Sequence, residues 1–144
     1  SSVWAVVAAP AAALVTLPSG FATPRLVAGN VVGYPLVDTA GVAVLELRAK
    51  VAGVVRLVFD ATAPSGERQF RIQDAQGEQP FTFNGSMHFD LNVAVQRGVS
   101  QLVLKTDPAP TSEADAVVLS RLTVEPGSGA ATLHAIPASG EPGF

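Results

Sequence analysis

The sequence predicts an all-β fold, a two-sheet antiparallel β-sandwich of the jelly-roll type. The chain of 144 residues is 48% hydrophobic and 15% charged and contains 13 Gly and 11 Pro, which suits short strands and tight turns better than long helices. Turn signals recur along the chain at the spacing typical of an antiparallel sandwich. Several segments alternate between apolar and polar residues, and no useful stretch has the period of a helix. We therefore expect one domain with a substantial core.

The expected strands are short and rich in Val, Leu and Phe. In chain order they cover residues 42–49, 54–60, 68–74, 88–96, 101–106, 116–125 and 131–136. The expected turns between them include Pro-Ser-Gly at 64–66, Gln-Gly at 76–77, Asn-Gly at 84–85 and Arg-Gly at 97–98. A single helical turn is expected near residues 111–116, where Thr111 or Ser112 can cap it.

The two ends of the chain differ in composition from the middle. Residues 1–19 form an apolar segment that is shorter than a membrane span, and we expect either a strand pair broken at Pro10 or an arm that a partner covers. Residues 20–126 form the expected sandwich domain. Residues 127–144 hold a final strand and a Gly- and Pro-rich tail, which we expect to be extended.

Period-two alternation separates the expected core from the expected surface. In residues 88–96, Phe89, Leu91, Val93 and Val95 share one face of the strand. The same parity directs further apolar side chains inward, namely Leu45, Leu47, Val55, Leu57, Phe59, Phe70, Ile72, Leu102, Leu104, Leu122 and Val124. A polar face then points outward, provided that its strands lie in one sheet: Glu46, Arg48, Arg56, Asp60, Gln69, Arg71, Gln73, His88, Asp90 and Asn92.

This outward face gives the candidate binding residues. Guanidinium, amide and carboxylate groups offer paired donors or acceptors to sugar hydroxyls, and a sugar ring stacks on an exposed aromatic ring. The candidate ligand-binding residues are Tyr34, Arg56, Gln69, Arg71, His88, Asp90 and Asn92, with Tyr34 expected in an exposed turn between Gly33 and Pro35. Trp4 and Phe21 are candidates for partner contacts. The alternative is an ordinary solvated face without a ligand.

Composition argues against several other chemistries. A formal net charge of -3 provides no footprint for nucleic acid. The absence of cysteine excludes disulfides and thiol chemistry, and His88 and His134 stand alone in the sequence, so we expect no metal, cofactor or catalytic residue. Asp107, Glu113 and Asp115 share one loop, but their spacing does not match a calcium loop, and a structural turn at Asp107 is the favoured alternative to calcium binding.

Two runs near the end of the chain carry a family resemblance. Residues 98–110, Gly-Val-Ser-Gln-Leu-Val-Leu-Lys-Thr-Asp-Pro-Ala-Pro, and residues 115–120, Asp-Ala-Val-Val-Leu-Ser, resemble the closing strands of the carbohydrate-binding-module-like β-sandwich domains of actinobacterial integral-membrane glycosyltransferases. Ser-Gly-Phe at 19–21 and Arg-Gln-Phe-Arg-Ile at 68–72 agree more loosely, so the resemblance spans about residues 20–125. It implies a galactose-binding-like jelly roll outside the cytoplasm, without catalytic activity, that contacts envelope glycans such as arabinan, galactan or mannan.

A second class of function stays open beside this one. The absence of cysteine, the apolar amino-terminal segment and the extended tail also suit a structural subunit of a symmetric assembly, such as a decoration or tail protein of a phage particle. That alternative predicts a homo-oligomer located in a virion, whereas the glycan-binding module is expected in the cell envelope with a glycan or a neighbouring domain as partner. A hydrolase ranks last, because no carboxylate pair stands out.

Overall fold

The structure is a computed structural model that describes residues 5–7, 13–22, 24–127, 133–134 and 136–137. Its strands, in chain order, are β1 (Ala5–Val7), β2 (Ala13–Ser19), β3 (Arg25–Val27), β4 (Asn30–Leu36), β5 (Val42–Ala49), β6 (Gly53–Asp74), β7 (Gly77–Val95), β8 (Gly98–Asp107), β9 (Val117–Pro126), β10 (Leu133–His134) and β11 (Ile136–Pro137). A 3-10 turn, η1 (Glu113–Asp115), lies between β8 and β9 with Ser112 at its N-cap position, where the Ser112 side chain makes no capping hydrogen bond. The all-β prediction and the predicted helical turn are confirmed.

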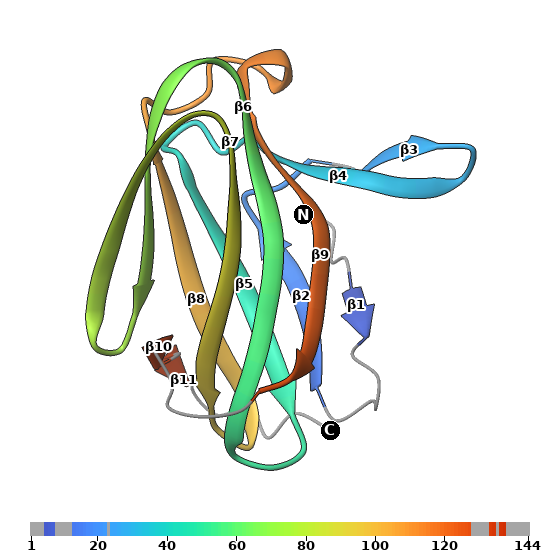
Figure 1. The fold of residues 1–144 in the computed structure, drawn as a ribbon, viewed down its shortest axis with the longest axis vertical. Coiled ribbons are helices and arrows are strands. Elements are labelled where there is room, and N and C mark those ends of the chain that lie inside the picture. The colour runs from blue at the N-terminus through green and yellow to red at the C-terminus, as the bar shows by residue number, and fades with distance from the viewer. Residues whose placement is uncertain (1–4, 8–12, 23, 128–132, 135, 138–144) are drawn as a thin grey trace.

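The strands form one continuous, largely antiparallel sheet that curls over itself, so that two layers, called here the first and the second sheet, pack face to face (Figure 1). The first sheet contains β3, β4, β9, residues 53–62 of β6 and residues 86–95 of β7. The second sheet contains β1, β2, β5, β8, residues 67–74 of β6 and residues 77–84 of β7. The β6–β7 hairpin therefore belongs to both sheets, and the predicted two-sheet sandwich is confirmed.

The chain turns at two of the predicted places without leaving the strands. At Pro-Ser-Gly 64–66 and Asn-Gly 84–85, β6 and β7 arch over one end of the sandwich and run back in the other sheet (Figure 1), and the register of their pairing shifts between Thr62 and Glu67. Gly66 and Gly85 have φ of 69° and 91°, a left-handed conformation that suits a bulge as well as a tight turn. These glycines bend the hairpin from one sheet to the other (Figure 1). The tight turn that joins β6 to β7 lies at residues 74–77, as Gln-Gly predicted.

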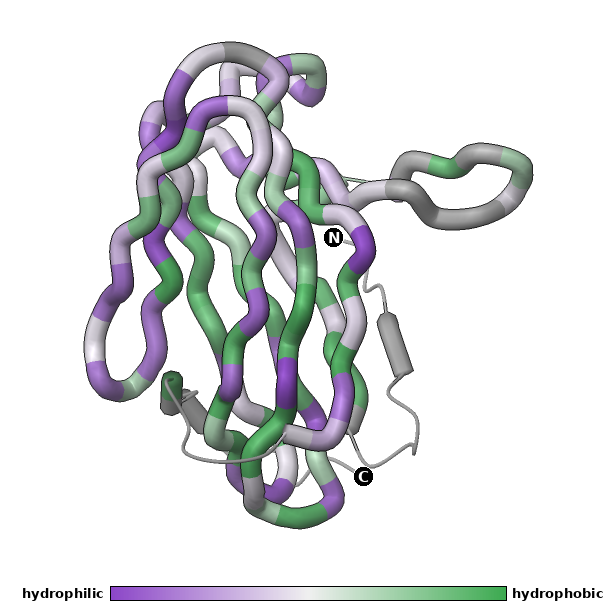
Figure 2. The backbone as a smooth tube through the Cα atoms, viewed as in Figure 1, coloured by the Kyte–Doolittle hydropathy of each residue, from purple (hydrophilic) through white to green (hydrophobic). Residues whose placement is uncertain are grey.

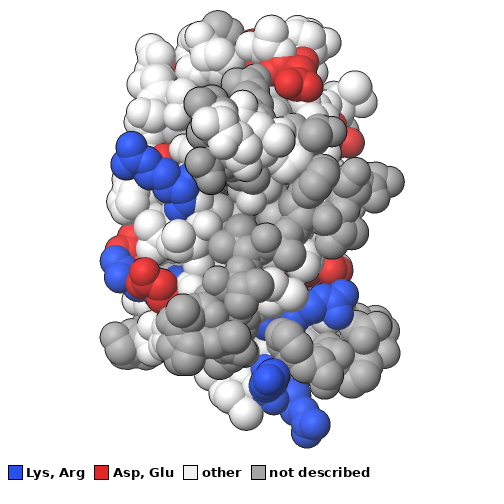
Figure 3. Space-filling view, turned by 90° about the vertical axis from the view of Figure 1, so that its right-hand side faces the viewer, with Lys and Arg blue, Asp and Glu red and all other residues white. Residues whose placement is uncertain are grey.

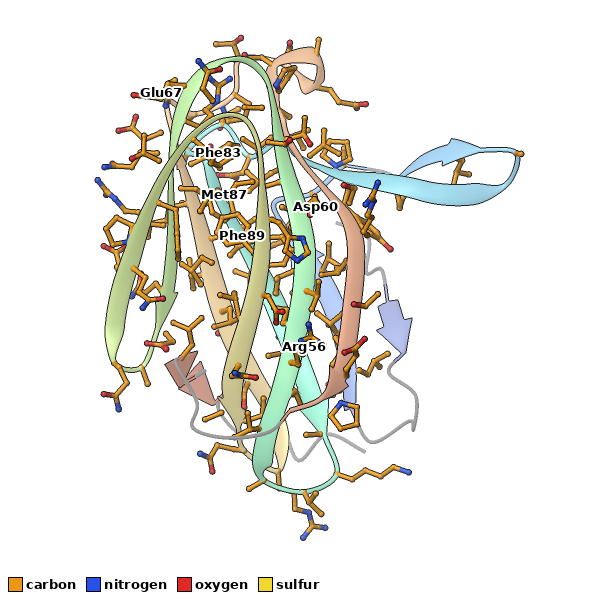
Figure 4. The ribbon with its side chains drawn as sticks, viewed as in Figure 1. Arg56, Asp60, Glu67, Phe83, Met87 and Phe89 are labelled. Carbon is orange, nitrogen blue, oxygen red and sulfur yellow. The ribbon has the colours of Figure 1, made fainter. Side chains whose placement is uncertain are left out.

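The core fills the space between the sheets. All the side chains that parity directs inward are buried, and Figure 2 shows the alternation of hydrophobic and hydrophilic residues along the strands. Phe89 of the first sheet stacks on Phe59 at 4.9 Å between ring centroids and lies 5.4 Å from Phe70 of the second sheet. Phe81 meets the edge of Phe89 at 5.0 Å, and Phe83 meets Phe70 at 6.2 Å (Figure 4). Aromatic packing therefore joins the sheets beneath the bend of the hairpin.

The segments at both ends contribute to this sandwich. β1 pairs with β2, and β2 pairs with β5 and packs Val15 and Leu17 into the core. Near the other end, β10 runs parallel to β7 and places Leu133 in the core, while β11 pairs with β8. Pro10, residues 131, 132 and 135 of the predicted strand and residues 138–144 of the predicted extended tail lie outside the described residues.

Candidate functional site

A hollow of about 230 Å³ opens on the outer face of the second sheet, where β5 begins and β8 ends. The residues that line it come from three strands and two loops: Ala40, Val42, Gln69, Arg71, Lys105, Thr106, Asp107 and Ala109. Gln69 and Arg71 are two of the ligand-binding residues that the sequence predicted. The hollow is therefore the candidate site, because concave sites with a few convergent polar groups are where small ligands bind.

Strand register brings the polar side chains of the site together. Val42 of β5 pairs with Lys105 of β8, which pairs in turn with Arg71 of β6. Two residues further toward the end of the sheet, Asp107 of β8 pairs with Gln69 of β6. Residues at alternate positions share a face of a sheet, so the outward-facing side chains at these positions form one continuous polar group.

Two loops wall the hollow at the end of the sheet. In the loop before β5, the Asp38 carboxylate accepts hydrogen bonds from the backbone N–H groups of Ala40 and Val42, at 3.0 and 3.1 Å. The Thr106 N–H donates to the carbonyl oxygen of Gly41 at 2.8 Å, which joins this loop to the end of β8. These bonds hold the wall in place.

The polar side chains of the site are partly oriented by one another. An Arg71 Nη2–H group donates to Gln69 Oε1 at 2.6 Å, and Lys105 Nζ lies 2.8 Å from Glu78 Oε2 beside the hollow. The hydrogen bond from Lys105, together with the positive charges of Lys105 and Arg71, holds the pKa of Glu78 below its ordinary value of 4.5. Arg71 and Lys105 each have more than one N–H group, and the Gln69 amide can donate as well, so donors remain for a ligand beside the acceptors of Asp107.

The outer face of the first sheet carries the other predicted ligand residues. The Arg56 guanidinium donates to both carboxylate oxygens of Asp90, at 2.8 and 2.6 Å, and to Glu125 at 3.0 Å. His88 Nδ1 lies 2.6 Å from Asp60 Oδ1, and Arg121 Nε lies 3.6 Å from Asp60 Oδ2 (Figure 4). The hydrogen bond from Arg56 lowers the pKa of Asp90, and the hydrogen bond to Asp90 raises that of Arg56. None of these side chains lines the hollow.

The structure therefore divides the predicted polar face. Gln69 and Arg71 lie on the second sheet, whereas Arg56, His88, Asp90 and Asn92 lie on the first sheet, so the two groups belong to opposite outer faces. The single polar face was predicted on the condition that its strands lie side by side in one sheet. That condition is not met, because β6 and β7 cross from the first sheet to the second at the bend. Asn92 is half-buried and pairs with Arg56 across the strands.

Two aromatic side chains that were expected to be available for binding are buried. Tyr34 was expected to be exposed in a turn, but it lies within β4, pairs with Leu119 and is 7% exposed. Burial raises the pKa of its hydroxyl. Phe21 is 7% exposed and belongs to the core, so its ring is not available to a partner. Trp4 lies outside the described residues.

Sequence reasoning missed Lys105 and the loop residues Ala40 and Ala109. Lys105 follows the alternation of β8 and could have been placed on an outward face, but the sequence does not show that β8 lies between β5 and β6. Asp107, which was considered as a calcium ligand or a turn residue, is the last residue of β8 and lines the hollow. The Asp115 carboxylate accepts a hydrogen bond from the buried Arg68 at 2.7 Å, and within the described residues no group of three His, Cys, Asp or Glu side chains is placed to hold a metal.

A smaller hollow of about 160 Å³ lies at the end of the β6–β7 hairpin, beside Leu133. Asp74 lines it, but its carboxylate already accepts hydrogen bonds from the N–H groups of Gln76 and Gly77, at 2.8 and 3.1 Å. Those bonds shape the hairpin turn. The hollow at the end of β8 is therefore the stronger candidate.

Charge is mixed over the surface that the structure describes. Figure 3 shows Lys and Arg side chains interspersed with Asp and Glu on the side of the molecule that carries β9. A stripe of a single sign, as a polyanion would require, is not seen among the described residues of this side. No helix in the described part of the chain is long and apolar enough to cross a membrane.

The comparisons with known proteins give only distant structural neighbours. No protein-family model and no curated protein matches the chain. Among solved structures, a CBM35 from Paenibacillus barcinonensis is 13% identical with a TM-score of 0.45. The matched region covers 90% of this chain and 100% of the CBM35 chain. A family 29 carbohydrate-binding module is 15% identical, with a TM-score of 0.35 over 78% of this chain and 87% of its own. The apo module BiXyn10A CBM1 is 12% identical, with a TM-score of 0.36 over 89% and 91%.

Proposed function

We propose that this chain is a non-catalytic module that binds a glycan in the hollow at the end of β8. The observation that carries the proposal is the convergence of Gln69, Arg71, Lys105 and Asp107 on one concave site. Amide, guanidinium and ammonium groups donate to hydroxyl oxygens, and the Asp107 carboxylate accepts from hydroxyl protons. Each hydroxyl group of a sugar can donate and accept hydrogen bonds, so adjacent hydroxyl groups are complementary to these donors and to the carboxylate acceptor.

Recognition in this site depends on hydrogen bonds and aliphatic contacts. Among the described residues, the aromatic side chains Phe21, Tyr34, Phe59, Phe70, Phe83 and Phe89 are buried, and Phe81 packs against the core. None of them lines the hollow, where Val42, Ala40 and Ala109 supply the apolar contacts. A ligand with many hydroxyl groups and a modest apolar surface fits this lining better than a flat apolar molecule.

We also propose a cellular location and a class of glycan for this module. We place the module outside the cytoplasm, in the cell envelope, in association with a membrane glycosyltransferase. Envelope arabinan, galactan and mannan are its candidate ligands. The resemblance of residues 98–110 and 115–120 to the closing strands of such modules supports this choice, and Lys105 and Asp107 of the hollow lie within that resemblance. The alternative of an assembly subunit stays a prediction of the sequence.

The test compares two arginine variants on the same outer face. Arg71→Ala removes a donor of the hollow, whereas Arg48→Ala removes an arginine that pairs with Val99 at the opposite end of β8. Hydrogen bonds to charged groups contribute about 1.5–3 kcal/mol, so Arg71→Ala is expected to weaken glycan binding about tenfold to a hundredfold. Arg48→Ala is expected to bind as the unmodified chain does.

Affinities are measured by isothermal titration calorimetry, with the glycan selected on an array of arabinan, galactan and mannan fragments. Circular dichroism melting curves confirm that both variants are folded. Equal affinities of Arg71→Ala and the unmodified chain would place the glycan elsewhere. The absence of binding to every fragment would remove the glycan-binding proposal itself.

A further inference from the structure

The hollow at the end of β8 is small for a carbohydrate site. Pockets that hold a drug-sized ligand have volumes of about 300–1,000 Å³, whereas this hollow has about 230 Å³. Its polar side chains, Gln69, Arg71, Lys105 and Asp107, come from two neighbouring strands and surround a single space. This size matches one sugar ring better than two linked rings.

The hollow is closed at the end of the sheet. The Gly41 loop and the segment after β8 are packed so tightly that a Cβ atom on Gly41 would lie 2.5 Å from the Thr106 carbonyl oxygen and 3.2 Å from Ala109 Cβ. The hydrogen bond from the Thr106 N–H to Gly41 also closes this contact. A glycan chain, which is wider than a methyl group, cannot leave the hollow between these segments.

In the other direction the outer face of the second sheet continues beyond the hollow. Val42 and Lys105, which line it, are each two residues from Val44 and Val103, a cross-strand pair of half-buried side chains on the same face. Gln101 follows Val103 at the next outward position, where it donates to Glu46 at 3.3 Å. A chain bound in the hollow can therefore extend in one direction.

A sugar inside a glycan has neighbours on both sides, whereas a terminal sugar has one. Resting on the proposed function, we infer that the hollow binds the terminal, non-reducing sugar residue of a glycan. That residue is substituted only at its anomeric carbon, so its other hydroxyl groups are available to the side chains of the hollow. The rest of the glycan leaves the site over Val44 and Val103 with few specific contacts.

The experiment measures how affinity depends on the length and the ends of the ligand. The probes are fragments of one to six residues from whichever series, arabinan, galactan or mannan, binds the unmodified chain on the array. Terminal recognition predicts that calorimetric affinities from disaccharide to hexasaccharide agree within about threefold and that each molecule binds one protein chain. A rise of about tenfold or more with length, or several proteins on one fragment, would overturn the inference.

Two modified hexasaccharides distinguish recognition of the non-reducing end of the glycan from recognition of its reducing end. Per-O-methylation of the non-reducing residue is expected to abolish binding, whereas reduction of the opposite end to the alditol is expected to leave the affinity unchanged. The reverse pattern would overturn the inference. Gln101→Ala is the protein control, and it is expected to bind the hexasaccharide as the unmodified chain does. If no fragment binds the unmodified chain, the proposed function itself fails, which differs from a failure of terminal recognition.

Discussion

The two outer faces of the sandwich carry similar side chains and use them differently. On the first sheet, Arg56 is held by Asp90 and Glu125, so the charged groups of this face satisfy one another. On the second sheet, Arg71 and Lys105 border a hollow and keep N–H groups beyond their contacts with Gln69 and Glu78. Polar composition alone therefore does not identify a binding face; the shape of the surface and the remaining hydrogen-bonding capacity do.

Breaking the core beneath both faces is expected to have the largest effect. Phe89 is 2% exposed and contacts Phe59, Phe70 and Phe81, so it links the two sheets. Phe89→Ala is expected to lower the free energy of unfolding by about 3–5 kcal/mol, because it leaves a cavity between them. Urea denaturation followed by circular dichroism measures the change. A loss below about 1 kcal/mol would mean that this ring does not join the sheets.

Filling the hollow is expected to remove the glycan binding that distinguishes the second sheet from the first. Ala40 is an exposed residue of the wall whose backbone N–H, and not its side chain, makes the loop hydrogen bond. Ala40→Trp places a large ring in the hollow and is expected to weaken glycan binding about tenfold or more. Ala52→Trp, in the exposed turn between β5 and β6, is the matched control. Similar affinities of the two variants in calorimetry would show that the hollow is not the site.

Removing the ion pairs of the first sheet is expected to leave binding unchanged. Arg56→Ala breaks the contacts with Asp90 and Glu125, whose side chains are 40% and 48% exposed. Exposed pairs are screened by salt, so the small loss in melting temperature is expected to shrink as sodium chloride is raised. Glycan affinity should match that of the unmodified chain. A clear loss of affinity would transfer the site to the first sheet.

The smallest expected effect concerns one carboxylate on each face. Lys105 lowers the pKa of Glu78, and Arg56 lowers that of Asp90, so both pairs stabilise the fold above the ordinary pKa values of 4.5 and 3.8 and lose this contribution as pH falls through the lowered values. Lys105→Met is expected to raise the pKa of Glu78 and leave that of Asp90 unchanged, and Arg56→Met to do the reverse. NMR titration of the carboxyl carbons measures both. A shift of both groups in one variant would contradict independent faces.

Most of the fold could be predicted from the sequence because strand alternation is a local property. Phe59, Phe70, Phe89, Leu91 and Leu104 are buried as their parity predicts. The unbroken pairing of β6 with β7 through residues 62–67 and 84–86 could not be predicted, since a glycine with positive φ suits a bulge within a paired strand as well as a turn between two strands.

The candidate site was predicted only in part, because it depends on which strands become neighbours. Gln69 and Arg71 were found from their outward parity, but the sequence does not show that Lys105 and the Ala40 loop lie beside them. Tyr34 was misplaced because Gly33 looks like a turn residue, whereas a Cβ atom at Gly33 would collide with the Val118 side chain of β9. That glycine is needed for close strand packing and not for a turn.

The most direct test of the glycan site is an NMR titration of the isotopically labelled chain with the glycan fragment that binds on the array. The structure predicts saturable shifts of backbone amides around Ala40, Val42, Gln69, Arg71 and Lys105, which line the hollow of the second sheet. Amides around Arg56, His88 and Asp90 on the first sheet should keep their positions. Shifts confined to the first sheet, or no saturable shifts at all, would contradict the account.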